Sequence, residues 1–139
     1  MRVFLDAKIL FSAAKSDGAV RAVLRLLSAR GHECCADAYV VAEARRNLAA
    51  KGPHAVQVLD ALLGHLLVAP ALADTVIAAE LAWLPTKNRP VLAAAIRLGC
   101  DALVTGDRKH FGSAYGHRFG GVAIHSPRSL AEAVLASGH

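Results

Sequence analysis

Cysteine is scarce in this sequence, and its pattern excludes two classes of protein. Two of the three cysteines, Cys34 and Cys35, are adjacent inside an apolar run. This arrangement is neither a disulfide framework nor the ligand spacing of a zinc site, so we interpret the cysteines as reduced core residues. The opening of a signal peptide is also lacking, because Asp6 and Lys8 interrupt the start and no small-residue cleavage site follows. We therefore predict a cytoplasmic protein.

Long apolar runs are missing as well. The most apolar stretch, residues 61–84, contains Gly64, Pro70, Asp74 and Glu80, and acidic groups are costly in the middle of a bilayer. The sequence therefore predicts no contact with a membrane. Of the 139 residues, 55% are hydrophobic, which excludes a disordered tail and is enough for the core of one domain over residues 1–139.

Charge of either sign is not gathered into a block. The chain carries 16 Lys and Arg against 11 Asp and Glu, a formal net charge of +5. An excess of this size permits a polyanionic partner without identifying one, and improved solubility is the alternative interpretation.

Strand and helix patterns alternate along the chain. We predict strands over residues 2–5, 33–36, 66–69, 102–105 and 122–125. We predict helices over residues 9–14, 20–30, 38–51, 54–63, 75–84 and 91–98, and a last one after Pro127. Residues 108–121, rich in Gly and His, are predicted to be a loop. The alternation predicts a three-layer α/β/α fold, with a short parallel sheet of four to five strands and helices on both faces.

Acidic residues fall where such a fold places its functional site, at the carboxyl ends of the strands. Asp6 follows the first strand and Asp107 the fourth, while Glu43 lies on the helix after the second. Asp101 precedes the fourth strand, so we expect it at the opposite edge in a turn or cap. Each of the first three acids alone could be structural, and Asp6 and Asp107 could each cap a helix. Together they repel one another, and a divalent ion is the simplest remedy. Such an ion activates water for attack on a phosphodiester.

Three segments give the sequence a family resemblance: VFLDAKILFSAA, VVAEARRNL and NRPVLAAAIRLGCDALVTGDRKHF. Together with their spacing they resemble the PIN-domain family, metal-dependent ribonucleases that include the VapC-like toxins of bacterial toxin–antitoxin pairs. The resemblance implies a parallel sheet between helices and a cluster of acids that binds Mg²⁺ or Mn²⁺. Carried over by position, the catalytic acids are Asp6, Glu43 and Asp107. Thr105 matches a hydroxyl that the family often places beside the last acid.

Two positions depart from the family pattern. Asn88 stands where the family usually has a third acid, so the implied metal ligands are Asp6, Glu43, Asn88 and Asp107. Lys8 stands where the family usually has a small polar residue. Both changes are expected to weaken the binding of a divalent ion. Three interpretations of Lys8 stay open: a solvated side chain, a replacement for the metal's charge beside Asp6 and Glu43, or a contact to an RNA phosphate.

Basic residues surround the predicted site in the sequence, and an ordinary solvated rim is the alternative to RNA binding. The candidate RNA contacts are Arg45, Arg46, Arg89, Arg108 and Lys109, with Lys87 nearby. His110, His117 and His125 form no known ligand pattern, and we interpret them as surface or loop residues. Trp83 is interpreted as a packing residue because it has no interleaved aromatic partner.

The resemblance and the acids together predict a metal-dependent endoribonuclease, with RNA as substrate and Mg²⁺ or Mn²⁺ as cofactor. The family implies the toxin of a toxin–antitoxin pair, with a cognate antitoxin, and a homodimer for which the apolar helices over residues 54–84 offer a surface. The alternative is a catalytically weakened PIN-fold module that binds RNA or a protein, because of Asn88 and Lys8.

Overall fold

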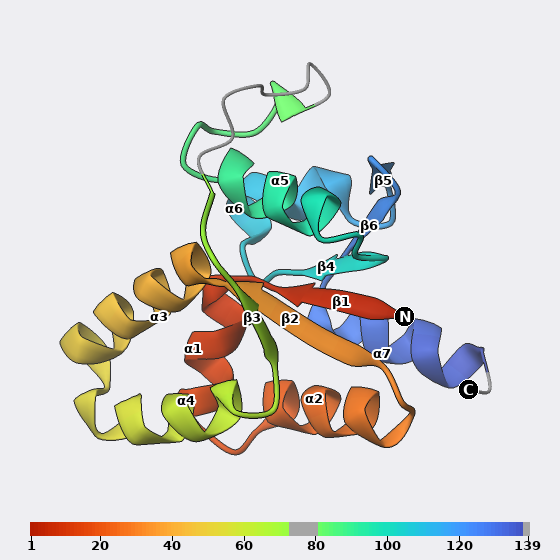
Figure 1. Cartoon of the computed structure of the whole chain (residues 1–139). Coiled ribbons are helices and arrows are strands. Elements are labelled where there is room, and N and C mark those ends of the chain that lie inside the picture. The colour runs from red at the N-terminus through yellow and green to blue at the C-terminus, as the bar shows by residue number, and fades with distance from the viewer. Residues whose placement is uncertain (73–80, 138–139) are drawn as a thin grey trace.

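A mostly parallel sheet runs through the centre of the molecule (Figure 1). The computed structural model describes residues 1–72 and 81–137, and within them six strands are ordered β3-β2-β1-β4-β6-β5. The strands are β1 (Arg2–Leu5), β2 (Glu33–Asp37), β3 (Leu67–Ala69), β4 (Ala102–Val104), β5 (Arg118–Phe119) and β6 (Val122–His125). β1 pairs in parallel with both β2 and β4, so the segments that follow these three strands leave the sheet at one edge.

Helices cover both faces of the sheet, which confirms the predicted three-layer α/β fold. α5 and α6 lie on one face, and α1, α2, α4 and α7 on the other, with α3 at the edge where β2 ends (Figure 1). The helices are α1 (Ala7–Lys15), α2 (Ala19–Ala29), α3 (Ala38–Lys51), α4 (Val56–Leu63), α5 (Arg89–Arg97), α6 (Arg108–Phe111) and α7 (Pro127–Ala136), with short 3₁₀ turns at Pro53–Ala55 and Gly112–Ala114. Within the described residues, no helix is long and apolar enough to cross a membrane.

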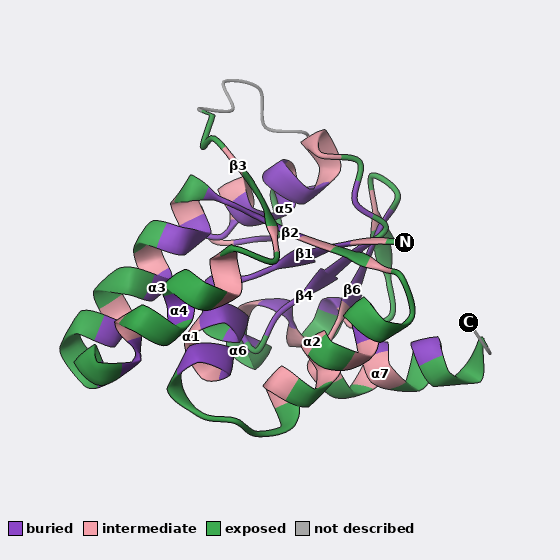
Figure 2. Cartoon of the chain, turned by 60° about the horizontal axis from the view of Figure 1, so that its bottom comes forward, coloured by how far each residue is buried: buried purple, intermediate pink, exposed green. Residues whose placement is uncertain are grey.

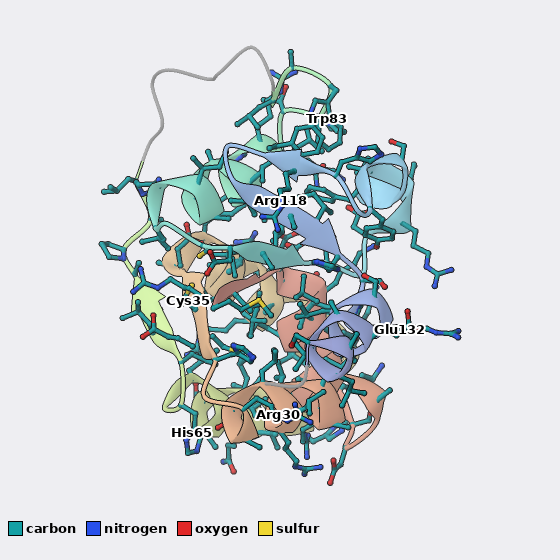
Figure 3. All side chains as sticks on the ribbon, turned by 90° about the vertical axis from the view of Figure 1, so that its right-hand side faces the viewer. Arg30, Cys35, His65, Trp83, Arg118 and Glu132 are labelled. Atoms are coloured by element: carbon teal, nitrogen blue, oxygen red, sulfur yellow. The ribbon has the colours of Figure 1, made fainter. Side chains whose placement is uncertain are left out.

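Side chains from the central strands and the inner helix faces form the core. Val3, Phe4 and Leu5 of β1 are fully buried, because helices cover both sides of this central strand. Figure 2 shows the same division, with buried strands and exposed outer helix surfaces. Cys35 lies in this interior (Figure 3), and its Sγ is 3.2 Å from that of Cys100. All three cysteines are free thiols, as predicted.

Carboxylates at the ends of strands begin the next helices. Asp6 caps α1 by accepting a hydrogen bond from the Ala7 amide, and Asp37 caps α3 by accepting one from the Val40 amide. The helix predicted over residues 38–51 is confirmed at both ends, because Asp37 starts it and Gly52 stops it. At the opposite edge of the sheet, Asp101 accepts a hydrogen bond from the Arg2 amide, as its predicted position requires.

Three predictions about the elements were wrong in detail. Residues 108–121 are not a continuous loop, because they contain α6, a 3₁₀ turn and β5, which pairs with β6. This strand raises the sheet above the predicted four to five strands, and its pairing is antiparallel. Residues 82–84 form turns and a bend rather than the end of a helix over 75–84. The remainder of that predicted helix, with Asp74 as its cap, falls on residues 73–80 and so mostly outside the described residues.

The turn between β5 and β6 requires glycine. Gly120 and Gly121 have φ angles of 57° and 83°, in the left-handed region that the two-residue turn of a β-hairpin uses. A Cβ atom on Gly120 would lie 2.8 Å from Cδ1 of Ile96, so both the backbone conformation and the available space exclude a side chain there.

Candidate active site

A small cavity opens where β1, β2 and β4 end, and we call it the acid cavity. Its volume is 120 Å³. It is lined by Asp6, Ala7, Lys8, Tyr39, Glu43, Lys87, Asn88, Val91, Asp107 and His110. The acids Asp6, Glu43 and Asp107, with Asn88, come from the four positions at which the sequence predicted ligands. Because these positions are far apart in the sequence, the parallel strands are what bring them together.

Asp6 is held in one orientation by two donors. Its Oδ1 accepts from the Ala7 amide at 2.7 Å, and its Oδ2 accepts from the Thr105 hydroxyl at 2.7 Å. Asp6 is 5% exposed, and burial raises the pKa of its carboxyl group above the ordinary value although both hydrogen bonds act in the opposite direction. The nearby charges of Glu43 and Asp107 raise the pKa further. An added positive charge in the cavity would therefore stabilise the ionised form of Asp6.

Thr105 links the two buried aspartates. While its hydroxyl donates to Asp6, its Oγ1 accepts from the Asp107 amide at 3.0 Å. The Thr105 side chain is fully buried, and its backbone oxygen accepts from the Tyr115 hydroxyl. The Thr105 side chain thus connects the Asp6 carboxylate to the backbone of Asp107.

Asp107 has partners on both carboxylate oxygens. Oδ1 accepts from the His110 amide at 3.2 Å, and Oδ2 lies 2.7 Å from Nδ1 of the His110 ring. Burial raises the pKa of Asp107, but the hydrogen bonds from His110 and the charge of Lys8 outweigh it and hold the pKa below its ordinary value. Asp107 is therefore ionised at neutral pH.

Asn88 points into the acid cavity with one satisfied group and one unsatisfied group. Its Nδ2 donates to Oδ2 of Asp107 at 3.3 Å. Its Oδ1 is buried, and no described residue forms a hydrogen bond with it. A buried amide oxygen without a partner costs free energy, which an incoming cation or donor would recover.

Lys8 approaches a different acid from those that its metal-replacing interpretation names. Its Nζ lies 3.8 Å from Oδ1 of Asp107, and its side chain is 60% exposed. Within the described residues it forms no ion pair with Asp6 or Glu43. The ammonium group is thus partly solvated at the mouth of the cavity, where it can reach a ligand as well as Asp107.

Two of the predicted RNA contacts are engaged elsewhere in the protein. Arg45 pairs with Asp60 on α4 at 2.7 Å. Arg89 donates from Nε to the Leu84 carbonyl and from Nη2 to the Ala82 carbonyl. Arg46, Arg108 and Lys109 are exposed, and none of them forms an ion pair with another described residue.

Sequence reasoning assigned no role at the site to two polar residues of the cavity, Tyr39 and His110, whereas Lys87 was expected near it. The Tyr39 hydroxyl donates to the Lys87 carbonyl, which ties α3 to the segment before α5. His110 was interpreted as a surface or loop residue, yet its side chain is 18% exposed and bonded to Asp107. The available signal was its position three residues after a helix-capping aspartate, where backbone and side chain can both reach the cap.

The oxygen donors of the acid cavity are of the kind that a hard divalent ion prefers, although they do not form a ready-made cluster of ligands. Within residues 1–72 and 81–137, no three His, Cys, Asp or Glu side chains form a group that could hold a metal ion. The donors that remain are the carboxylates of Asp6 and Asp107 and the unpartnered amide oxygen of Asn88, with Glu43 on the same cavity. These are all oxygen ligands, which Mg²⁺ and Mn²⁺ prefer.

Trp83 packs against other aromatic rings, as its interpretation as a packing residue predicted, but the reason given from the sequence was wrong, because Trp83 has two aromatic partners. Its ring is perpendicular to that of Phe111, with 6.2 Å between the ring centroids, and tilted against that of Phe119, with 4.9 Å between the centroids. Figure 3 shows Trp83 at the end of the molecule away from α2.

Comparison with known proteins identifies the same family as the motifs. A family model described as PIN domain matches residues 2–109, which include all four predicted ligands. No curated protein sequence matches the chain.

Solved structures resemble the fold at low sequence identity. A chain of VapBC2 from Rickettsia felis, bound to a promoter DNA fragment, has a TM-score of 0.68 at 19% identity, covering 91% of this chain and 98% of that one. A chain of DNA-bound VapBC from Salmonella typhimurium has a TM-score of 0.67 at 16% identity, and the match covers 91% of this chain and 98% of that one. VapC20 from Mycobacterium tuberculosis, described as a Sarcin-Ricin loop cleaving toxin, has a TM-score of 0.59 at 15% identity, covering 81% and 94%.

Proposed function

The chain belongs to the PIN domain family, and from this premise we propose that it is an endoribonuclease that depends on Mg²⁺ or Mn²⁺. One observation carries the proposal. The acid cavity combines three carboxyl groups, from the ends of β1 and β4 and from α3, with the buried amide oxygen of Asn88 at the start of α5, which has no hydrogen-bond partner among the described residues. This oxygen-only donor set is suited to a hard divalent ion and to few other ligands.

Asp6, Asp107 and Asn88 would hold the ion, and Glu43 lines the side of the cavity formed by α3. When bound, the ion supplies an activated water for attack on a phosphodiester and stabilises the leaving oxygen. Asp107 is ionised at neutral pH before an ion binds, because its pKa is held below the ordinary value. The burial and neighbouring acids that raise the pKa of Asp6 make this carboxylate the one that gains most from a cation.

Residues around the ligands orient them and receive the substrate. Thr105 holds the Asp6 carboxylate through its hydroxyl and the Asp107 backbone through its Oγ1. Lys8 can lend its charge to an RNA phosphate at the mouth of the cavity, since its side chain is 60% exposed and its Nζ lies 3.8 Å from Oδ1 of Asp107. Arg46, Arg108 and Lys109 extend this positive charge along the rim.

We propose further that the chain acts as the toxin of a toxin–antitoxin pair. Support comes from the similar chains in VapBC complexes from Rickettsia felis and Salmonella typhimurium. Co-purification with the product of a neighbouring gene tests this role, and a chain that is recovered alone when the two genes are expressed together would count against it.

A homodimer is proposed on the surface formed by α4 and β3. β3 is at the edge of the sheet, and Val58, Leu67, Val68 and Leu72 are 37%, 45%, 42% and 56% exposed. Exposed apolar side chains along an edge strand favour association with another chain. Sedimentation of the parent and of Val68→Lys measures it: a dimer that Val68→Lys converts to monomer supports this surface, whereas an unaffected dimer excludes it.

The alternative function is a binding module with a weakened metal site. Asn88 supplies no charge, and Lys8 and the His110 ring lie against the Asp107 carboxylate that an ion would need. On this alternative the chain binds RNA or a protein partner and does not cleave.

RNA cleavage with Mn²⁺ distinguishes the two functions. We compare the parent, Asp6→Asn and the double variant Asn88→Asp/Lys8→Asn, which restores the family pattern. Cleavage by the parent and its loss in Asp6→Asn support the enzyme. If the parent is as inactive as Asp6→Asn while the double variant cleaves, the chain is a binding module.

A further inference from the structure

A second cavity, which we call the lysine groove, lies between α1 and α3 beside the acid cavity. Its volume is 260 Å³, and it is lined by Lys8, Phe11, Ser12, Asn47, Lys51 and Gly106. α1 packs directly on α3, as Figure 1 shows. The groove is therefore built on two helices that are fixed against each other, which makes it a rigid surface.

The sequence places the lining residues on facing sides of the two helices. On α1, Phe11 and Ser12 come three and four residues after Lys8, so both lie on the same side of the helix as Lys8. On α3, Asn47 and Lys51 are four residues apart and lie on one face in the same way. This arrangement gives the groove two ammonium groups, a hydroxyl, an amide and an aromatic ring.

The lining carries positive charge and hydrogen-bond donors, and none of its described residues is acidic. Lys51 forms no ion pair within residues 1–72 and 81–137, so its charge is available. Lys15 adds another positive charge nearby, since its Nζ lies 5.2 Å from the centre of the Phe11 ring. Charge without a carboxylate is the lining that a phosphate group requires, and an aromatic ring offers a surface on which a base can stack.

The groove adjoins the acid cavity. Lys8 lines both cavities. Gly106 stands between Thr105 and Asp107, and a Cβ atom there would lie 3.7 Å from Cβ of Lys8. Because residue 106 has no side chain, it places nothing between the acids and the lysines. A strand whose scissile phosphate is at the acids would thus lead directly into the groove.

We propose that the lysine groove binds the RNA strand next to the scissile phosphate, with Lys8 and Lys51 on a neighbouring phosphate and the Phe11 ring against a base. The proposal rests on the proposed ribonuclease function and adds the subsite that holds the substrate. Lys51 is the better residue for testing the groove, because it lines only the groove, whereas Lys8 lines both the groove and the acid cavity.

RNA binding without cleavage tests the groove. Labelled single-stranded RNA is titrated by fluorescence anisotropy in EDTA over a range of salt concentrations, with every variant built on Asp6→Asn. We expect Lys51→Gln to raise Kd roughly three- to tenfold and to make the slope of log K against log salt shallower by about 0.7. Lys51→Arg keeps the charge and is expected to keep the slope.

The aromatic contact has a different signature. Phe11→Leu keeps an apolar side chain for packing but removes the ring, so Kd rises roughly tenfold while the salt slope stays unchanged. Arg128→Gln is the control, because Arg128 on the distant α7 is a solvated cation paired only with Glu132 among the described residues. This variant also removes one positive charge, and its Kd and salt slope are expected to equal those of Asp6→Asn alone.

The outcomes separate the groove from the enzyme. If Lys51→Gln and Phe11→Leu bind RNA as Arg128→Gln does while the parent cleaves RNA with Mn²⁺, the groove proposal is overturned and the proposed function stands. If the parent neither binds nor cleaves RNA, both are overturned. Weaker binding in Lys51→Gln with the shallower slope, together with cleavage by the parent, supports the groove as a substrate subsite; the same binding result without cleavage overturns the ribonuclease function and, with it, the placement of the groove next to a scissile phosphate.

Discussion

Replacing Asn88 with Asp should make the stability of the protein depend more strongly on a divalent ion in the acid cavity. In the parent, Nδ2 of Asn88 donates to Oδ2 of Asp107 at 3.3 Å. An aspartate of the same shape replaces that donor with an oxygen, so two carboxylates face each other. Two unit charges 3.3 Å apart repel by about 5 kcal/mol at an effective dielectric constant of about 20. Uptake of a proton by one carboxyl group relieves part of this repulsion. We therefore take about 5 kcal/mol as the upper limit of the loss of folding stability of Asn88→Asp in EDTA.

A divalent ion reverses the sign of the effect. At about 4 Å in water, a double positive charge attracts one added negative charge by about 2 kcal/mol, and more where water is excluded. We therefore expect Mn²⁺ to bind Asn88→Asp at least about 30-fold more tightly than the parent. At saturation this adds about 2 kcal/mol to the stabilisation by metal, or roughly 6 °C in Tm for a domain of this size.

Thermal unfolding with and without Mn²⁺ measures both effects. In EDTA, Asn88→Asp should unfold below the parent, and with Mn²⁺ the difference should shrink or reverse. Asn88→Ala is the matched control, since it removes the amide oxygen without adding charge and should be stabilised by Mn²⁺ less than the parent. An equal stabilisation of all three proteins by Mn²⁺ would refute the reasoning, because the side chain at position 88 would then lie outside the coordination of the ion.

Three further predictions follow from the described contacts. Burial raises the pKa of Asp6 in the folded state, so the protonated carboxyl group contributes stability at low pH, and this contribution is lost as the pH rises through that pKa. Urea unfolding in EDTA should therefore find Asp6→Asn more stable than the parent at pH 7, and the difference in unfolding free energy should be smaller at pH 4. Thr105→Val leaves Asp6 without its hydroxyl donor and should lower RNA cleavage about tenfold, with Thr105→Ser restoring most of it, whereas equal loss in both variants would exclude a positioning role. Gly120→Ala strains a left-handed turn against Ile96 and should cost about 1–3 kcal/mol of unfolding free energy, while Gly112→Ala, at a helical φ of −57°, should cost much less.

The sequence was sufficient to predict the elements that end in strong signals. Asp37 and Gly52 mark the two ends of α3, and the helix over residues 38–51 has those bounds. The carboxyl-end rule for parallel strands brought Asp6 and Asp107 to one cavity without any knowledge of packing, because it depends only on strand direction.

The details that escaped prediction depend on short segments and on long-range contacts. α6 and β5 have four and two residues, too few to show a periodic pattern, and β5 exists because its backbone pairs with β6. The place of His110 beside Asp107 follows from α6 and could not be predicted without it. Arg45 and Arg89 looked like candidates for RNA because the sequence does not show Asp60 or the carbonyls that engage them.

The nature of the RNA ends is the measurement that tests the central claim most directly. Water activated by a divalent ion hydrolyses a phosphodiester, whereas attack by the neighbouring 2′-hydroxyl leaves a 2′,3′-cyclic phosphate. Mass spectrometry of RNA fragments produced by the purified chain should find no cyclic phosphate ends, and the fragments should require Mn²⁺ and disappear with EDTA or with Asp107→Asn. Cyclic phosphate ends, or fragments that persist in EDTA and in Asp107→Asn, would contradict hydrolysis by a metal ion in the acid cavity.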